Sequence, residues 1–425
     1  MPFSSLGLTP ATLPAFLRAV SEAGYPAPTA IQSAAIPAIL QGRDVLASAR
    51  TGSGKTAAFA LPMLQQWMDS PRNARGNSPR HTHGLILVPT RELAAQVGQT
   101  LRSLAQYLPQ RVKVAVLFGG VSINPQMLNL RGGADIVVAT PGRLLDLIAH
   151  RAVSIGEVKT LVLDEADRLL DLGFGEELSR ILEKLPASRQ NLFFSATFPP
   201  AAQALAAHML HNPVRLDVHP APEAEALIVQ RAIEVDAARR TQLLRHLVQS
   251  EKWERVLVFV ATKHAAETVA DKLRKAAIQA EPFHGELSQG KRTQVLRDFK
   301  AKVVQVVVAT DVAGRGLDIT QLPVVVNYDL PRSAVDYTHR IGRTGRAGES
   351  GVAVSFVSSG TAAHFRLIEK RQGLTVSREQ IVGFEPIEVA AQGLENKNDP
   401  LSVGGVKGKR PSKKDKLREA AAKNG

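Results

Sequence analysis

Short apolar runs alternate with helical patterns along most of the chain. From about Asp44 onward, each run ends in polar or Gly/Pro positions and is followed by a stretch with helical periodicity. Such runs are typical of strands buried on both faces of a parallel sheet and joined by helices. In the first half the runs are Val45–Ala49, Leu85–Val88, Val112–Phe118, Ile136–Ala139, Leu161–Leu163 and Leu192–Phe194. The pattern predicts an α/β fold with a mostly parallel sheet.

The same alternation returns in the second half, which predicts a second domain of the same architecture. Its runs are Val256–Val260, Val303–Ala309, Val324–Asn327 and Val352–Phe356. Residues 211–226 are rich in proline and lack periodicity, which predicts a semi-extended linker. Beyond about Arg371 the alternation fades. We therefore expect domains at 1–210 and 227–370, a linker at 211–226 and a tail at 371–425.

The net charge of the chain predicts a polyanionic partner. The 425 residues contain 53 Lys+Arg against 39 Asp+Glu, a net charge of +14. This balance favours nucleic acid first and an acidic membrane surface second. Residues 405–425 are especially basic, and we expect a disordered tail that either tethers RNA or only solubilises the chain. Both alternatives stay open at this point.

Several classes of protein are excluded or disfavoured by composition. The chain has no cysteine, so it contains no disulfide, no thiolate nucleophile and no zinc site with cysteine ligands. No apolar run approaches the roughly 18 residues of a membrane span, and the first residues do not have the pattern of a secretory signal. We therefore expect a cytoplasmic protein without a membrane partner.

A phosphate-binding loop follows the first apolar run. The segment Ala49-Arg-Thr-Gly-Ser-Gly-Lys-Thr56 fits the loop pattern except at Ala49, where the pattern has glycine. Gly52 and Gly54 would let the backbone curl so that its N–H groups face phosphate oxygens. Lys55 would reach the β- and γ-phosphates, and the Thr56 hydroxyl would bind Mg²⁺. The alternative is a Gly/Ser-rich loop that only caps a helix.

A cluster of carboxylates ends another run, in Thr160-Leu-Val-Leu-Asp-Glu-Ala-Asp167. A buried parallel strand would carry Asp164 and Glu165 into the crevice where open α/β sheets bind ligands. One carboxylate would hold Mg²⁺, and the other would prepare the attacking water. Acidic residues that merely begin a helix are the ordinary alternative.

Together with these two motifs, the stretch Gly24–Gln32 resembles the DEAD-box family of RNA-dependent ATPases. The likeness continues through Pro89–Ala94, Gly119-Gly120, Thr140–Arg143 and Ser195–Thr197, and it covers roughly residues 3 to 360. The chain is similar to the bacterial RhlE-like branch, although Arg50 stands where the family often has glutamine. The resemblance implies two tandem RecA-like domains and an ATP-dependent RNA helicase that uses ATP and Mg²⁺.

The resemblance also implies roles for individual residues. Phe3 would stack on adenine and Gln32 would read its edge, against the alternatives of a core anchor and a helix-surface amide. The other implied nucleotide contacts are Arg50, Thr51, Gly52, Ser53, Gly54, Lys55, Thr56, Gly316 and Asp318. The implied catalytic residues are Lys55, Asp164, Glu165 and the arginine fingers Arg343 and Arg346, with Thr56 and Asp164 as metal ligands.

Two further sets follow from the same resemblance. Residues that couple the acidic strand end to the second domain are Asp167, Ser195, Thr197, His339 and Arg340. Residues that face RNA are Thr90, Arg91, Gly119, Gly120, Thr140, Gly142, Arg143, Thr310 and Gly314. The ordinary alternative for each of these is a turn or a helix cap, and Arg91 has the further alternative of an internal ion pair.

We therefore expect RNA-stimulated ATP hydrolysis, coupled to closure of the two domains and to local unwinding of short RNA duplexes. Contacts to sugar and phosphate would make RNA binding independent of sequence. Ribosomal or other ribonucleoprotein particles are candidate partners, and we expect a monomer. The rival interpretations are a DNA helicase or translocase, and an RNA-binding or annealing protein without turnover.

Overall fold

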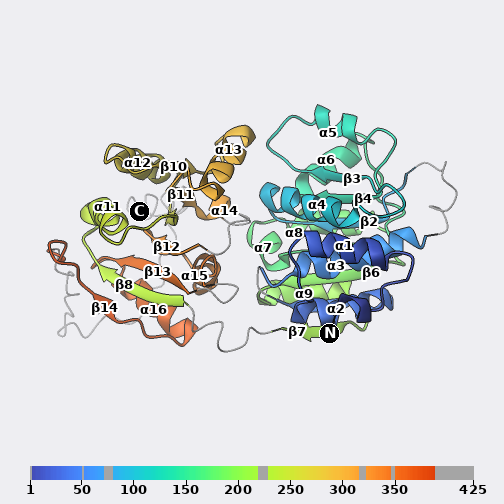
Figure 1. Ribbon diagram of the computed structural model, residues 1–425, viewed down its shortest axis with the longest axis horizontal. Helices are drawn as coiled ribbons and strands as arrows, with labels where there is room; N and C mark the ends of the chain where they lie inside the picture. Colours follow the sequence, from blue (N-terminus) through green and yellow to red (C-terminus); the bar gives the residue numbers. More distant parts are fainter. Residues whose placement is uncertain are drawn as a thin grey trace, which may run out of the picture. The chain divides into compact units, whose positions relative to one another are not determined.

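The strands of the computed structural model form two separate parallel sheets (Figure 1). The structure describes residues 2–49, 52–70, 80–218, 228–314, 322–345 and 350–387. Each sheet has seven strands in these residues, and every strand pair is parallel. The expected α/β architecture with two domains is therefore confirmed.

The first sheet has the strand order β3-β4-β2-β5-β6-β1-β7. All residues of the inner strands β2, β4 and β5 are buried, which explains why each is an almost uninterrupted aliphatic run. The strands are β1 Val45–Ser48, β2 Gly84–Leu87, β3 Val114–Leu117, β4 Ile136–Ala139, β5 Thr160–Leu163, β6 Gln190–Ser195 and β7 Val214–Asp217.

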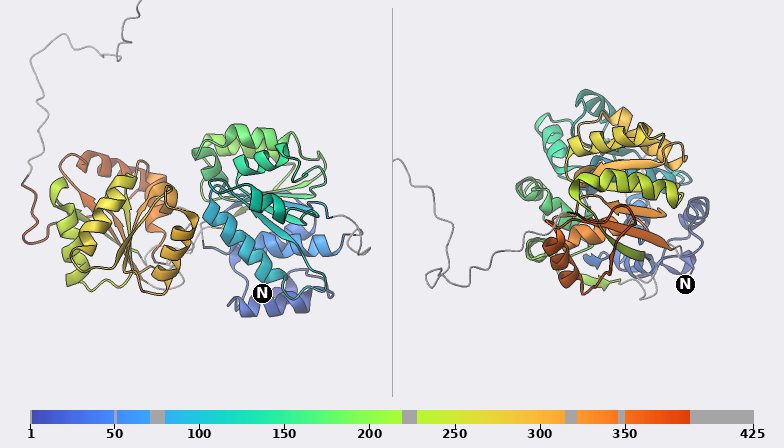
Figure 2. Two further views of the ribbon diagram at one scale, coloured as in Figure 1. Left: turned by 90° about the horizontal axis from the view of Figure 1, so that it is seen from above. Right: turned by 90° about the vertical axis from the view of Figure 1, so that its left-hand side faces the viewer.

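Helices cover both faces of the first sheet (Figure 2). Successive residues of β6 point to opposite faces of the sheet. Phe194 packs against residues of α1 to α4, and Phe193 packs on the other face, against residues of α6 to α9. The helical elements are η1 Phe3–Ser5, α1 Leu13–Glu22, α2 Ala30–Leu40, α3 Lys55–Met68, α4 Arg91–Ala105, α5 Asn124–Asn129, α6 Pro141–Ala149, α7 Ala166–Asp171, α8 Gly175–Leu182 and α9 Pro200–Met209.

The second sheet repeats this plan in the order β10-β11-β9-β12-β13-β8-β14. Its strands are β8 Ile228–Glu234, β9 Val256–Val260, β10 Ala280–Phe283, β11 Val306–Thr310, β12 Val324–Asn327, β13 Gly351–Val357 and β14 Arg378–Glu379. Its helices are η3 Ala237–Arg239, α11 Arg240–Ser250, α12 Lys263–Arg274, α13 Gln289–Lys300, α14 Asp311–Gly314, α15 Ala334–Ile341 and α16 Ala362–Gln372. Position by position, β8 corresponds to β1, β12 to β5 and β14 to β7.

Two expected boundaries need correction. The expected linker at 211–226 overlaps β7, which pairs along its whole length with β1. The expected tail at 371–425 overlaps β14, which pairs with β8, and the following Ile381 and Phe384 pack against the second core. Both strands lie at a sheet edge; β7 alternates apolar with charged residues and β14 consists of Arg378 and Glu379, so neither gives an apolar run. Residues 388–425, and with them the predicted disorder, lie outside the described residues.

Within the described residues, no helix combines the length and the apolar character that a membrane crossing requires.

Candidate nucleotide and RNA-facing sites

The loop between β1 and α3 is shaped by two glycines in a left-handed conformation. Gly52 has a φ of 83° and Gly54 a φ of 92°, a region that side chains other than glycine enter only with strain. Gly54 directly precedes α3, and a Cβ atom on it would lie 2.5 Å from Nε2 of Gln32. The turn places Lys55 and Thr56 at the start of α3. Arg50 and Thr51 lie outside the described residues.

Gln32 ties this loop to the start of α2. Its side chain is fully buried, so the alternative of a helix-surface amide is wrong. Its Oε1 atom accepts a hydrogen bond from the backbone of Thr29 at 2.9 Å, and its Nε2 atom donates to the carbonyl of Gly54 at 3.1 Å. The amide is therefore held in one orientation beside the loop, and its contact with adenine stays a prediction.

Phe3 is only 5% exposed and belongs to the apolar cluster on the α1–α4 side of the sheet. This position agrees with the core-anchor alternative. Its stacking on adenine stays a prediction.

The Lys55 ammonium group is buried without a hydrogen bond. The residue is 5% exposed, and its Nζ atom has no hydrogen-bond partner among the described residues. The nearest carboxylate oxygen, Oδ1 of Asp164, lies 3.8 Å away, beyond hydrogen-bond distance. An unsatisfied buried ammonium is unfavourable, and a phosphate oxygen would satisfy it.

The end of β5 carries two buried carboxylates with opposite pKa shifts. Burial raises the pKa of Asp164 to about 6, although Lys55 opposes that shift. Burial acts on Glu165 in the same direction, but Arg168 and then Lys55 outweigh it and lower the pKa of Glu165 to about 2. Glu165 accepts a hydrogen bond from Nη1 of Arg168 at 3.0 Å. An ionised but weakly basic Glu165 suits orientation of a water molecule better than early removal of its proton.

Asp164 and Thr56 offer the oxygen atoms that a Mg²⁺ ion prefers. Asp164 is 2% exposed, and the one hydrogen bond to its carboxylate within the described residues comes from the backbone of Glu165, at 3.0 Å. A buried carboxylate with spare acceptor capacity beside a phosphate loop fits a divalent cation. Cation binding would favour the ionised carboxylate and oppose the rise of the Asp164 pKa to about 6.

The three coupling residues of the first domain are brought together by hydrogen bonds. Asp167 accepts two of them from Thr197, at 2.6 Å from Oγ1 and 3.0 Å from the backbone. Ser195, the last residue of β6, accepts from the backbone of Asp167 at 3.2 Å and donates to the carbonyl of Thr197 at 2.6 Å. These hydrogen bonds fix Asp167, which follows the acidic end of β5, to Ser195 and Thr197 at the end of β6. The coupling role of the three residues stays a prediction.

The first two groups of RNA-facing candidates lie at one edge of the sheet. Thr90 follows β2 and caps α4 by accepting a hydrogen bond from Leu93 at 3.3 Å, as its ordinary alternative requires. Gly119 and Gly120 follow β3, which is parallel to β2 but separated from it by β4. Arg91 donates to the carbonyl of Gly120 at 3.4 Å, and a Cβ atom on Gly120 would lie 2.6 Å from its guanidinium carbon. Arg91 therefore has a carbonyl partner in place of the expected alternative of an ion pair.

The third group follows β4, which lies between β3 and β2 in the sheet. Thr140 immediately precedes α6, and Gly142 faces open space. Arg143 is 8% exposed and donates to the carbonyl of Val121 at 2.8 Å, but its Nη1 atom has no hydrogen-bond partner among the described residues. Because β3, β4 and β2 are parallel neighbours, all three groups lie at the carboxyl ends of the strands, the same end of the sheet from which the nucleotide loop leaves β1.

Comparison with known proteins agrees with this geometry. Residues 29–205 match the family model for the DEAD/DEAH box helicase, and residues 239–348 match the helicase conserved C-terminal domain. The ATP-dependent rRNA helicase rrp3 of Emericella nidulans is 43% identical over 341 residues, which cover 80% of this chain and 71% of that protein. The chain belongs to the DEAD-box helicase family.

Two other similar proteins extend the comparison. The ATP-dependent RNA helicase DeaD of Mycobacterium tuberculosis (strain CDC 1551 / Oshkosh) is 41% identical over 374 residues, or 88% of this chain. The aligned region spans 64% of the length of that relative. A solved structure of S. cerevisiae Dbp5 bound to RNA and ADP BeF3 matches 89% of this chain and 95% of that chain, with a TM-score of 0.76 and 30% identity.

In the second half of this DEAD-box chain, Arg340 is the centre of a buried network. Its guanidinium forms two hydrogen bonds with Asp311, at 2.6 and 2.7 Å. It also donates to Oδ1 of Asn327 at 3.1 Å and to the carbonyl of Asp329 at 2.6 Å. These contacts hold β11, β12 and α15 together. The expected connection of Arg340 to the acidic strand end stays a prediction.

The remaining candidates of the second half are only partly described. Arg343 is 3% exposed and follows α15, which ends at Ile341. Gly342 is the C-cap of α15. His339 lies in the last turn of α15, Thr310 ends β11 and Gly314 ends α14. Gly316, Asp318 and Arg346 lie outside the described residues.

Arg168 is the functional residue that the sequence reasoning missed. It is 2% exposed, and its ion pair with Glu165 sets both the orientation and the charge of that carboxylate. A signal was present, because Arg168 follows Glu165 by three residues at the start of a helix, a spacing that brings side chains together.

Proposed function

We propose that this DEAD-box protein is an ATP-dependent RNA helicase. It would hydrolyse ATP in an RNA-stimulated manner, close its two domains around both ligands and separate short RNA duplexes locally. The observation that carries the proposal is the Lys55 ammonium, buried without a hydrogen bond between the loop glycines and the acidic end of β5. A decayed or purely structural site would have no need to keep a lysine in that position.

The first half would bind and orient the nucleotide. Lys55 holds the β- and γ-phosphates, and Thr56 and Asp164 are the residues that would hold Mg²⁺. When bound, the ion neutralises charge that develops on the phosphate oxygens. Glu165 accepts a hydrogen bond from the attacking water, and Arg168 keeps the Glu165 carboxylate in place. The buried position of these groups strengthens each electrostatic contact.

The second half would complete the reaction on closure. Arg343 and Arg346 are the proposed fingers on the γ-phosphate, with Gly316 and Asp318 as further nucleotide contacts and His339 in a coupling role. ATP and RNA favour the closed state because each ligand would bridge both domains. Support comes from the similar Dbp5 structure, which holds RNA together with ADP BeF3.

The partner would be RNA gripped through sugar and phosphate by the groups at the carboxyl edge of the first sheet and by Thr310 and Gly314. A net charge of +14 supports this choice. Ribosomal or other ribonucleoprotein particles are proposed partners, and the name of the related rRNA helicase rrp3 supports them. We further propose a monomer that acts in the cytoplasm, where RNA and ATP are both present.

The test is ATP hydrolysis by the full-length protein with single-stranded RNA, with single-stranded DNA of the same sequence and without nucleic acid. We expect strong stimulation by RNA, weak stimulation by DNA, and loss of the stimulated rate in Glu165→Gln. Glu183→Gln is the matched control, because Glu183 is an exposed residue at the end of α8.

Each contrary outcome points to a specific rival. Stronger stimulation by DNA would indicate a DNA helicase or translocase. Hydrolysis at equal rates with and without RNA would leave an ATPase without the RNA-driven step. No hydrolysis in any sample, combined with tight RNA binding, would favour an RNA-binding or annealing protein.

A further inference from the structure

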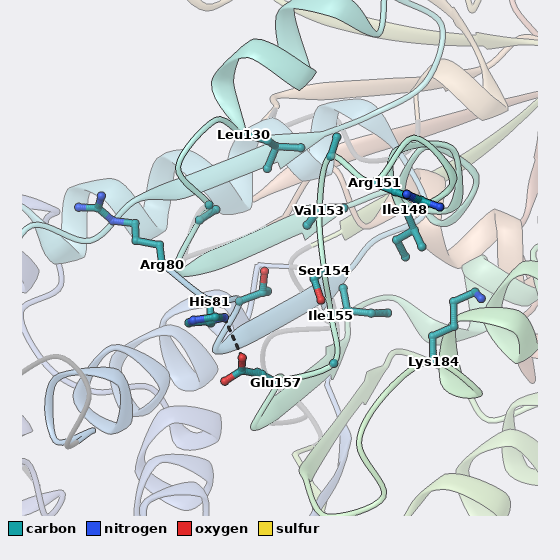
Figure 3. A pocket seen from close by; sticks show the side chains of 15 residues that line it. Arg80, His81, Leu130, Ile148, Arg151, Val153, Ser154, Ile155, Glu157 and Lys184 are labelled. Atoms are coloured by element: carbon teal, nitrogen blue, oxygen red, sulfur yellow. Dashed lines mark ion pairs between the residues drawn. The ribbon is translucent and has the colours of Figure 1, made fainter. Parts of the chain in front are cut away.

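A hollow lies at the amino ends of the strands of the first sheet, the end opposite to the nucleotide loop (Figure 3). Its volume is about 550 Å³, within the range of pockets that bind ligands or side chains of partners. Its lining comes from the segments 80–82, 133–134 and 154–157, which directly precede the parallel strands β2, β4 and β5. The end of α6 and Lys184, just beyond α8, complete it. The nucleotide and RNA-facing groups occupy the other ends of these same strands.

The hollow combines an apolar interior with a basic rim. Leu130, Ile148, Val153 and Ile155 supply the aliphatic surface. Three cationic side chains stand around it in Figure 3, namely Arg80, Arg151 and Lys184. The one carboxylate of the lining, Glu157, is engaged by His81 at 2.8 Å. The surface therefore favours an occupant that is apolar at its centre and negatively charged at its edges.

Two of the three cations are available to such an occupant. Arg80 is committed to Asp135, with its Nε atom 3.1 Å from the carboxylate. The side chains of Arg151 and Lys184 are exposed and form no hydrogen bond or ion pair with another described residue. In Figure 3 both side chains lie on the same side of the hollow, across from Glu157, so this side offers two positive charges without a neighbouring carboxylate of the lining.

The backbone conformation of Arg151 decides which substitution the position tolerates best. Arg151 has a φ of 54°, the left-handed conformation that favours glycine or asparagine just beyond a helix. It follows α6, which ends at Ala149 with His150 as its C-cap. An arginine is strained in this position, and its side chain gains no contact among the described residues that would offset the strain. Lys252, Ala277 and Lys302 adopt the same conformation just beyond α11, α12 and α13, so it is an ordinary helix end at which glycine is well tolerated.

We propose that this pocket docks an acidic segment of a partner protein. A bulky apolar side chain of the segment would fill the hollow, and flanking carboxylates would pair with Arg151 and Lys184. RNA fits less well, because a phosphate backbone would not satisfy the aliphatic interior. Docking at this edge leaves the nucleotide loop and the RNA-facing edge uncovered, so a partner can be recruited without inhibition of the enzyme.

The pocket offers a variant that separates binding from folding. Arg151→Gly removes the guanidinium and at the same time relieves the left-handed strain, so the variant should be no less stable than the wild type. Lys184→Ala removes the second charge from an exposed position. The matched control is the double variant Arg245→Ala, Lys272→Ala, which removes the same net charge from exposed positions on α11 and α12.

The experiment measures fluorescence anisotropy of a labelled peptide, Glu-Asp-Leu-Phe-Asp-Glu, on titration with the full-length protein. We expect saturable binding that weakens by about three-fold in Arg151→Gly or Lys184→Ala and about ten-fold in the double variant. The control variant should bind like the wild type. Replacement of Leu-Phe in the peptide by Ala-Ala should also abolish binding. RNA-stimulated ATP hydrolysis and the melting temperature should not fall in any of these variants.

Three results would overturn the proposal. Equal losses in the control variant would show that the peptide senses only net charge. Undiminished binding of the Ala-Ala peptide would show that the apolar hollow is not used. Displacement of the peptide by single-stranded RNA, with a parallel loss of RNA affinity in Arg151→Gly, would assign the pocket to RNA.

Discussion

The two sheets have the same strand order, yet only one of them carries a nucleotide loop. After β1 the chain turns through Gly52 and Gly54 in left-handed conformations before α3 begins. After the corresponding β8 it passes through the short 3₁₀ turn η3 directly into α11, without a glycine. Topology brings the carboxyl ends of the strands together in both halves, but the phosphate cradle depends on local backbone freedom.

The buried cations of the two halves differ in the number of hydrogen bonds that they form. Arg340 in the second half forms four hydrogen bonds to Asp311, Asn327 and the Asp329 carbonyl, and it lies over the ring of Phe259 at 5.0 Å. Lys55 in the first half has no hydrogen bond among the described residues. A saturated buried charge marks a structural centre, whereas an unsaturated one marks a place prepared for a ligand.

The largest expected effect on stability comes from removal of the Arg340 guanidinium. Arg340→Met should lower the free energy of unfolding of the second half by about 3–5 kcal/mol, because the Asp311 carboxylate loses its partner. Hydrogen exchange of the β11 and β12 amides should report this loss. Asp311→Asn combined with Arg340→Met should recover part of it. Stability equal to that of the wild type would contradict the assigned role of Arg340.

Lys55→Met should lower the rate of ATP hydrolysis without lowering stability. The stability of the first half should stay unchanged or rise, since an unsatisfied ammonium is removed. The ATP hydrolysis rate should fall at least about 100-fold, because the phosphates lose a preorganised positive charge. Lys159→Met, at an exposed lysine just before β5, is the control for both measurements. A large loss of stability in Lys55→Met would mean that Lys55 is structural like Arg340.

Gly54→Ala tests whether the nucleotide loop depends on the left-handed backbone conformation of Gly54. The positive φ and the approach of Cβ to the Gln32 amide should destabilise the first half by about 1–3 kcal/mol and weaken nucleotide binding. Gly290→Ala, at an ordinary helical position on α13 with open space around it, should instead stabilise by up to about 1 kcal/mol. Urea unfolding and nucleotide titration distinguish the two; a neutral Gly54→Ala would contradict the steric argument.

The smallest expected effect concerns the corresponding edge strands β7 and β14. β7 pairs over four residues, whereas β14 pairs over two and is held by the ion pairs Arg378–Glu369 and Arg231–Glu379. Arg378 lowers the pKa of Glu369 below its ordinary value, and Arg231 does the same for Glu379. A carboxylate with a lowered pKa stabilises the fold above its unfolded pKa of 4.5 and loses that contribution as the pH falls through the folded value.

Acid should therefore loosen β14 before β7. Between pH 7 and pH 3.5 we expect the amide protection of the β14 segment to fall by about 1 kcal/mol, with a smaller change for β7. Hydrogen exchange at both pH values, corrected for the intrinsic exchange rate, measures the difference. Glu369→Gln should remove part of the pH dependence, and equal loosening of both strands would count against the ion pairs.

The sequence predicted the inner strands well because burial on both faces leaves a nearly pure aliphatic run. It missed the edge strands β7, β10 and β14, and also β8, an inner strand beside β14 that is only partly buried. β10 contains Glu281 and Pro282, which an edge strand tolerates and an inner strand does not. β7 alternates half-buried and exposed residues. Four such residues, with prolines on both sides, are too few for the alternation to be recognised as a strand pattern. Edge strands are defined by their neighbours more than by their own residues.

The site residues divide in a similar way. The positions of Lys55, Asp164 and Glu165 follow from local motifs, because the loop and the strand end are continuous in sequence. The contacts of Arg340 and the pairing of Arg168 depend on which elements the fold brings together, and a motif does not specify them. The buried amide of Gln32 is intermediate: its residue type was identified, but its partner Gly54 lies 22 positions away in the chain.

The fixed amide of Gln32 has a consequence for the choice of nucleobase. An amide oxygen has two lone pairs and an amide nitrogen has two hydrogens, and one of each is already used by Thr29 and Gly54. If ATP binds as proposed, the spare lone pair and hydrogen form a ready-made template for the amino group and ring nitrogen of adenine. Guanine presents two acceptors there, which an amide with one free hydrogen and one free lone pair does not match. If the contact with adenine forms, the fixed amide sets a preference for adenine over guanine before any nucleotide arrives.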